Sequence, residues 1–492
     1  MSPTLAIIVT MAVLCAAGAL PARMLAGWRP VTPFLAPIGG AVLAGAAGEL
    51  TVLVDGTEIG WFVPLAIGAN AAATASWLAR RESRRSPTAP RPRFVLWIVG
   101  GAGVLGVAAA TAWSLLSLAR VDIGSEARTI WLVHATWIQA GHATALAALT
   151  NQGLILSHSS YPPLSGATVA LGWAITGVSS LRVGQVVLAL LTGCAIAAVG
   201  ATVLEVGLIA AIRTAIRRNA LGATALTVIA GLLSAAWVLG AFGLAGPSAT
   251  NGSVDMLAAA CAVGAAAMGL VLPCGGEHGR AAAVLAVAAG LTTDDGIGAA
   301  IVVFVLIGLR WLSAPRHGPE PNASRVERHR GVIGATAAAW GVAGVIAWPV
   351  GAAIRRATTD YYLTGPRIGS PFGRADDVFH SMAPDLHLTG LAIVIGIAAS
   401  VLFRRARRSM GFGSDAWLWV LIVVELLAVG VLYAVGDQPV EPWLHSTAGA
   451  SALFAECLGL GLLAWWAVIG AAIVLAPKSE QAPEVPVPTP VA

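Results

Sequence analysis

Long apolar runs separated by short polar or basic segments form the pattern of this chain. About 20 apolar residues in a row allow a helix to cross the hydrocarbon core of a bilayer. By that measure we expect helices near 4–22, 32–54, 60–79, 94–119, 182–212, 220–245, 253–272, 281–310, 331–353, 388–403, 416–435 and 449–475. The string TTDDG (292–296) breaks the run 281–310, which predicts two short helices or a re-entrant hairpin there. The fold class is therefore an all-α polytopic membrane protein with about 11 to 14 transmembrane helices.

Arginine clusters between the apolar runs predict the orientation. They are RRESRRSPTAPRPR (80–93), RTAIRR (213–218), the stretch 310–330 and RRARR (404–408). Basic loops are retained on the cytoplasmic side, and all four clusters share that side if the run 281–310 enters and leaves from one face. The pattern predicts a plasma (inner) membrane protein whose N-terminus lies outside and whose C-terminus is cytoplasmic.

Composition narrows the function classes. Hydrophobic residues make up 57% of the chain and charged residues 11%, against about 25% charged residues in a soluble domain. The positive charge is spread over short loops, which argues against nucleic acid as a partner and for the lipid bilayer. Five scattered cysteines indicate neither a zinc site nor a disulfide framework. The N-terminus lacks a basic n-region, so we read it as a retained first helix, and the Pro-rich tail 476–492 as disordered.

Two polar segments, 120–181 and 355–388, are longer than a simple connection needs, and both lie on the predicted outer side. In the first, ARTIWLVHATWI (127–138) has the spacing of a juxtamembrane helix whose tryptophans sit at headgroup depth. A second short helix is expected within HSSYPPLSGATVALGWAITG (158–177), after its proline pair. These two segments hold most of the candidate chemistry.

Three strings in these segments resemble motifs of GT-C-type integral membrane glycosyltransferases, which use polyprenyl-phosphate sugars. EARTIW (126–131) is similar to D-A-R-x-I-W of that family, HSSYPPL (158–164) to H-P-x-Y-P-x-L, and TTDDG (292–296) to T-K-x-E-G. The resemblance covers the succession of apolar and polar segments from 94 to 475. Residues 1–93 are then additional transmembrane helices, and residues 476–492 are a cytoplasmic tail. It implies sugar transfer from a polyprenyl-phosphate donor to an envelope glycan or glycolipid outside the membrane.

The chain departs from the family pattern at several positions. Glu126 stands where relatives often have Asp, Ser159 replaces Pro, Ser160 replaces a more polar residue, and Thr293 replaces Lys. PWLHSTAGASALF (442–454) lacks the Arg usual in the corresponding family segment. A different donor, a different acceptor or lost activity would each fit these changes.

The resemblance and the chemistry together assign candidate roles. Sugar transfer needs a carboxylate that accepts the acceptor hydroxyl proton, and Glu126 is preferred over Asp122 because it aligns with the motif acid. The departing phosphate gains negative charge that cations stabilise. The candidate substrate-binding residues are Arg128, Trp131, His134, His158, Tyr161, Asp294, Asp295, Arg355, Arg356, Arg374 and His445. No metal ligand set is recognised, although Asp294 and Asp295 leave room for a divalent cation.

Other interpretations stay open at this point. Glu126 and Arg128 are also read as a solvated surface pair, His134 as an interfacial packing residue, and Asp294 with Asp295 as a water-exposed helix cap. A transporter or lipid flippase would place acids within spans, as at Glu205, Asp255, Asp294, Asp295, Glu425 and Glu456. A non-catalytic scaffold of envelope assembly fits the missing Lys and Arg.

Overall fold

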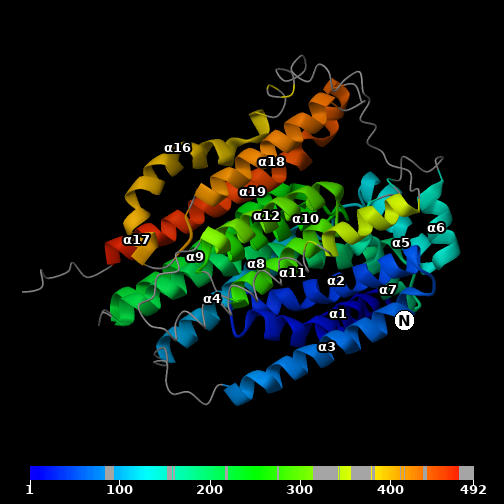
Figure 1. Ribbon diagram of the computed structural model, residues 1–492, viewed down its shortest axis with the longest axis horizontal. Coiled ribbons are helices and arrows are strands. Elements are labelled where there is room, and N and C mark those ends of the chain that lie inside the picture. The colour runs from blue at the N-terminus through cyan, green and yellow to red at the C-terminus, as the bar shows by residue number, and fades with distance from the viewer. Residues whose placement is uncertain are drawn as a thin grey trace, which may run out of the picture.

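The structure is a computed structural model, and its described part contains helices without a strand (Figure 1). It describes residues 1–83, 94–151, 158, 161–216, 220–273, 276–313, 342, 344–355, 378, 380, 383–409, 412–414, 416–435 and 440–475. Seven of its helices are long and apolar enough to cross a membrane. They span Pro3–Ala26, Thr32–Leu53, Glu58–Leu78, Ile98–Ser117, Leu181–Thr214, Ala220–Ala249 and Ala452–Leu475. The all-α polytopic membrane fold is confirmed.

The N-terminal helices pack closely because glycines face one another across their contact. α1 (Pro3–Ala26) and α2 (Thr32–Leu53) run side by side, followed by α3 (Glu58–Ser83) and α4 (Phe94–Ser117). A Cβ atom on Gly18 would overlap the carbonyl of Ala36, and one on Gly40 would overlap the carbonyl of Leu14. Small residues at both positions let the two backbones approach, as in other membrane helix pairs.

The segment after α4 folds into short helices at one end of the bundle. A π-helical turn (Ala127–Trp131) leads into α5 (Leu132–Gln139), and α6 (His142–Thr150) and α7 (Leu164–Thr176) follow. The expected short helices are present. Trp131, however, is only 1% exposed, so its ring faces the protein interior, and α5 packs against α7.

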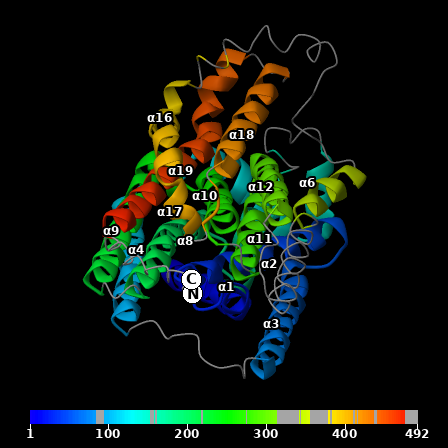
Figure 2. The same ribbon diagram turned by 60° about the vertical axis from the view of Figure 1, so that its left-hand side comes forward.

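The middle of the chain supplies the centre of the bundle. α8 (Leu181–Ile216) and α9 (Ala220–Ala245) are followed by α10 (Asp255–Ala266), which continues as a π-helical turn to Val271. The run broken by TTDDG forms two helices, α11 (Gly276–Gly290) and α12 (Asp294–Ser313). In both views α8 and α10 lie between the N-terminal helices and the C-terminal ones (Figures 1 and 2).

The C-terminal helices form a further group beside α10 and α12. They are α16 (His387–Leu402), α17 (Arg404–Ser409), α18 (Ala416–Val435) and α19 (Val440–Leu475). The Glu456 carboxylate of α19 accepts hydrogen bonds from the backbone N–H groups of Leu388 and Thr389, at 2.9 and 2.8 Å. This acid therefore caps the start of α16, and its position within a span has a structural explanation.

Hydrogen bonds between loops that are far apart in the sequence bring these loops together at one end of the bundle. Gly124 N donates to Asn251 O and Leu164 N to Leu291 O, both at 2.9 Å, and a ring nitrogen of His142 lies 3.0 Å from Thr51 O. We call the end formed by residues 51–58, 118–164, 246–255 and 291–295 the loop end. The opposite end holds Arg29 and is called the Arg29 end.

Candidate functional site

Glu126 lies in a tight group of polar side chains at the loop end. The Ser253 hydroxyl lies 2.9 Å from Asp255 Oδ2 and 3.4 Å from Glu126 Oε2. Gly252 makes this approach possible, since its φ of 95° belongs to the left-handed region and a Cβ there would stand 2.8 Å from the Cβ of Ala127. One hydroxyl has one proton to donate, so Ser253 can donate to only one of the two carboxyls at a time.

Burial and a neighbouring acid raise the pKa of Glu126 to about 7. Loss of water around the carboxylate is the larger cause, and repulsion from Asp255 adds to it. The Ser253 hydroxyl and the nearby His158 act in the opposite direction. A carboxyl with a pKa near neutrality holds and releases a proton at physiological pH, which suits a general base.

An acidic cavity continues from this group into the bundle. Asp255 of α10, Asp295 of α12 and Glu425 of α18 line it, with Phe454 of α19. Its walls between the acids are mostly alanine and glycine, and they leave about 410 Å³ of atom-free space counted to the open mouth. Asp255 lies close enough to Asp295, and Asp295 to Glu425, for their charges to repel each other.

A row of rings leads away from Glu126 along the loop end. His158 and Tyr161 have ring centroids 4.7 Å apart, and Tyr161 and Trp131 5.4 Å apart. Trp131 continues to His134 at 6.3 Å, and His134 stacks on Trp137 at 5.0 Å. Residues predicted separately from two strings of the sequence thus form one continuous row of rings, with Trp131 and His134 buried.

A second, largely apolar cavity borders the far part of this row. Its lining includes His134, Trp137, Tyr161, Val52, Pro163 and Trp348. These residues come from α2, α5, the turn before α7 and the helical segment 344–354. The aromatic row therefore has His158 near Glu126 at one end and borders the apolar cavity at the other.

His158 has an unusual backbone conformation. Its φ is 46°, and among the described residues it is the one non-glycine residue with a positive φ. Its carbonyl accepts a hydrogen bond from Tyr161 N at 2.9 Å, which closes the turn before Pro162. Strained backbone of this kind concentrates at functional sites, where surrounding contacts maintain it.

The predicted residues differ in how they relate to these cavities. Glu126, His158, Tyr161, Trp131 and His134 come together as described above. Asp295 lines the acidic cavity, whereas its neighbour Asp294 does not belong to the lining.

The predicted cations lie elsewhere. The side chains of Asp122 and Arg128 are exposed at the surface. Arg355 is also exposed and donates to the carbonyl of Leu53 at the end of α2. Arg356, Arg374 and the side chain of His445 lie outside the described residues.

Ser253, Asp255 and Glu425 are the site residues that the sequence motifs did not indicate. Asp255 and Glu425 were visible only as acids within apolar runs, and Ser253 carried no signal at all. The described residues contain no group of three or more His, Cys, Asp or Glu side chains placed to hold one metal ion. The divalent cation therefore stays a prediction without a ligand set in that part of the chain.

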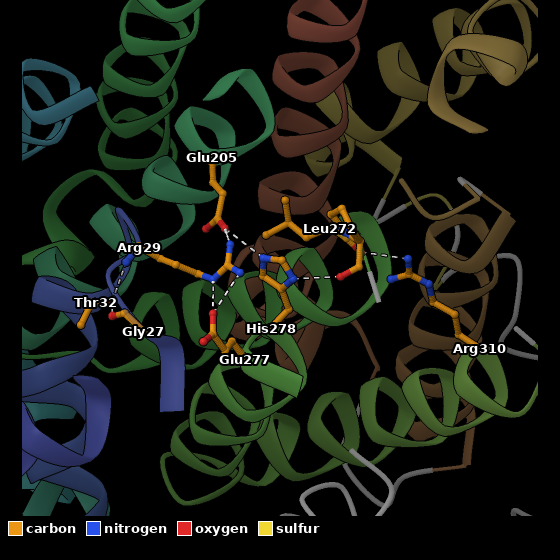
Figure 3. A network of polar contacts seen from close by, with 9 residues as sticks. Gly27, Arg29, Thr32, Glu205, Leu272, Glu277, His278 and Arg310 are labelled. Carbon is orange, nitrogen blue, oxygen red and sulfur yellow. Dashed lines mark hydrogen bonds and ion pairs between the residues drawn. The ribbon is translucent and has the colours of Figure 1, made fainter. Parts of the chain in front are cut away.

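Acids at the Arg29 end behave differently (Figure 3). Arg29 forms ion pairs with Glu205 and with Glu277, the latter at 3.1 Å. His278 Nε2 faces Glu205 Oε1 at 2.9 Å and its Nδ1 faces Pro273 O at 2.8 Å. Arg29 thus pairs with both acids and His278 contacts one of them, while the acids of the cavity have no such partners among the described residues.

No family of known proteins, no curated protein and no solved structure matches the chain.

Proposed function

We propose that this protein is a membrane glycosyltransferase that moves a sugar from a polyprenyl-phosphate donor to an envelope glycan or glycolipid acceptor. The observation that carries the proposal is the position of Glu126, a carboxyl with a pKa of about 7 between an acidic cavity and a row of aromatic rings. A base poised near neutrality beside ring surfaces suits a polar, ring-shaped substrate. The motif resemblance at 126–131 and 158–164 points to the same chemistry.

The proposed reaction uses Glu126 as the general base. The acceptor oxygen bonds to the anomeric carbon of the donor sugar while the bond from that carbon to the phosphate oxygen breaks. The acceptor proton passes to the Glu126 carboxylate, and the polyprenyl phosphate leaves with the bonding electrons. Asp255 and Ser253 are positioning residues, because they set the proton affinity of Glu126 without contacting the reacting atoms.

The position of the site at a bundle end fits a lipid-linked donor. A prenyl chain can stay in the bilayer beside apolar surface while its phosphate reaches the loop end. The apolar cavity with Trp137 and Trp348 lies beside the aromatic row and offers such a surface. Arg128 follows Glu126 by two positions with an exposed side chain, and it is our candidate for the contact with the phosphate.

We assign the loop end to the extracytoplasmic face of the plasma membrane. The predicted arginine clusters follow the ends of α3, α8, α12 and α16 that lie away from the loop end, and basic segments favour the cytoplasm. The N-terminus is then outside and the C-terminus inside. Labelling of single cysteines at residues 55 and 217 in intact cells tests this, because only position 55 should react with an impermeant reagent.

The activity is tested with purified protein in nanodiscs. A panel of radiolabelled polyprenyl-phosphate sugars and membrane glycolipid acceptors is offered to the wild type, to Glu126→Gln and to Asp122→Asn. We expect transfer by the wild type and a loss of about 10²- to 10⁴-fold in Glu126→Gln. Asp122→Asn serves as the matched control, because Asp122 is exposed. Transfer that survives Glu126→Gln and collapses in Asp122→Asn would move the base to Asp122.

A transporter is the second candidate, and one observation favours it. Glu425 lies within the apolar helix α18 with 6% of its surface exposed, and it lines the acidic cavity together with Asp295. Acids placed along a cavity within a membrane protein mark ion and proton pathways. Solute or proton flux through proteoliposomes, together with no sugar transfer from any donor, would support this candidate over the transferase.

A further inference from the structure

The acidic cavity holds an excess of negative charge that its own surroundings do not balance. Asp255, Asp295 and Glu425 come from three different helices and converge on one space. Within the described residues, none of the three forms an ion pair with Lys, Arg or His. The acids Glu205 and Glu277 at the Arg29 end differ from them, because both form ion pairs with Arg29.

Glu425 provides an independent sign that a ligand belongs there. Its side chain is 6% exposed and lines the cavity, and the described part of the chain gives its carboxylate no hydrogen-bond donor. A carboxylate that faces a cavity and has no donor from the protein loses part of its solvation. A ligand that donates hydrogen bonds to it would make up that loss.

The geometry selects among cationic ligands. A metal ion needs several ligands around one point, and the described acids do not converge in that way. A primary ammonium needs only one or two carboxylates and often rests against an aromatic ring. Phe454 supplies such a ring in the wall of the same cavity. Spaced carboxylates with an aromatic wall are therefore suited to an organic ammonium group.

We propose that the cavity between Asp255, Asp295 and Glu425 binds a substrate carrying a primary ammonium group, such as an amino sugar. This inference rests on the proposed function, because it takes the ligand to be the sugar that the donor or the acceptor carries. Asp295 and Glu425 hold the ammonium and so select the substrate. Glu126, which lies beyond Asp255 at the loop end, is left for the hydroxyl proton.

Binding of a matched probe pair tests this inference. Octyl 2-amino-2-deoxyglucoside and octyl glucoside differ only at carbon 2, where the first carries an ammonium group and the second a hydroxyl. Each is titrated into the full-length protein in nanodiscs at about pH 7. We expect the amino probe to bind about tenfold or more tightly, and its advantage to disappear in Glu425→Gln and in Asp295→Asn. Asp55→Asn removes an exposed acid of the same end and should leave binding unchanged.

Several results would overturn the inference. Equal affinity of the wild type for the two probes would do so even if a variant failed to fold, since that comparison needs no variant. An amino-probe preference that persists in well-folded Glu425→Gln and Asp295→Asn would also contradict it. The two proposals fail separately: transfer of neutral sugars without an ammonium preference removes this inference alone, whereas an ammonium preference without any transfer removes the proposed function alone.

Discussion

The Ser253 hydroxyl lies between two carboxyls, and this arrangement decides how Glu126 titrates. Because the hydroxyl can donate to only one of them at a time, the two carboxyls compete for its hydrogen bond. Asp255 raises the pKa of Glu126, and Ser253 lowers it. The carboxylate is the working form of a general base, so activity depends on how much of it exists at a given pH.

We predict that transfer rises with pH and reaches half its maximum near pH 7, the pKa of Glu126. An ordinary glutamate would already be ionised above about pH 5. Asp255→Asn removes a repelling charge and should move the midpoint to lower pH, whereas Ser253→Ala removes a hydrogen bond to the carboxylate and should move it higher. The profile of kcat/KM against pH measures both shifts. Equal midpoints in the three proteins would show that Glu126 does not control the rate.

A second prediction concerns the strained residue His158. Glycine and asparagine both tolerate its φ of 46°, but neither has an imidazole beside Tyr161. We expect His158→Gly and His158→Asn to keep the thermal unfolding midpoint of the wild type and to lose transfer by about tenfold or more. Full activity in either variant would restrict His158 to shaping the turn.

At the scale of elements, helix bounds were predictable and helix partners were not. The run 220–245 was expected and α9 has those bounds, because bilayer thickness fixes the length of an apolar run. The partnership of Glu126 with Ser253 joins positions 127 residues apart, and no local pattern encodes such a distance. The burial of Trp131 was not predictable for the same reason: its spacing indicated the helix, but Tyr161, whose ring lies 5.4 Å from it, comes thirty positions later in the chain.

The contact between α1 and α2 gives a prediction at this scale. A Cβ on Gly40 would overlap backbone atoms of Leu14, while nothing lies within 4 Å of a Cβ on Gly68 of α3. Gly40→Ala should therefore destabilise the protein by about 1–3 kcal/mol, and Gly68→Ala should be neutral or slightly stabilising. Thermal unfolding in nanodiscs compares them. Equal midpoints would mean that α1 and α2 separate at little cost.

At the scale of the whole molecule, charge is distributed unequally between the two ends. The Arg29 end joins α8, α11 and the α1–α2 connection through paired charges (Figure 3). The loop end concentrates acids around cavities instead. A sequence reveals which residues are charged, but pairing depends on which helices meet. Glu205 and Glu425 therefore looked alike as acids within apolar runs, although among the residues that the structure describes Glu205 has a cation beside it and Glu425 has none.

Removing the central acid of the paired network should be costly. Glu205 is buried against Arg29 and His278, so Glu205→Gln removes the buried carboxylate acceptor that both contact and should destabilise the protein by about 1–3 kcal/mol. Glu277→Gln changes the same network where both side chains are partly exposed, at 28% and 32%, and should cost about 0–1 kcal/mol. Unfolding measurements that rank the two variants in the opposite order would contradict this assignment.

The central claim is that sugar transfer takes place at the loop end with Glu126 as the base. The most direct test reconstitutes the protein in one orientation in proteoliposomes and supplies radiolabelled polyprenyl-phosphate sugar and glycolipid acceptor to one leaflet at a time. We predict transfer only when both substrates are in the leaflet that faces the loop end, with a rate about 10²- to 10⁴-fold lower in Glu126→Gln. Transfer from the leaflet at the Arg29 end, or an undiminished rate in Glu126→Gln, would contradict the account.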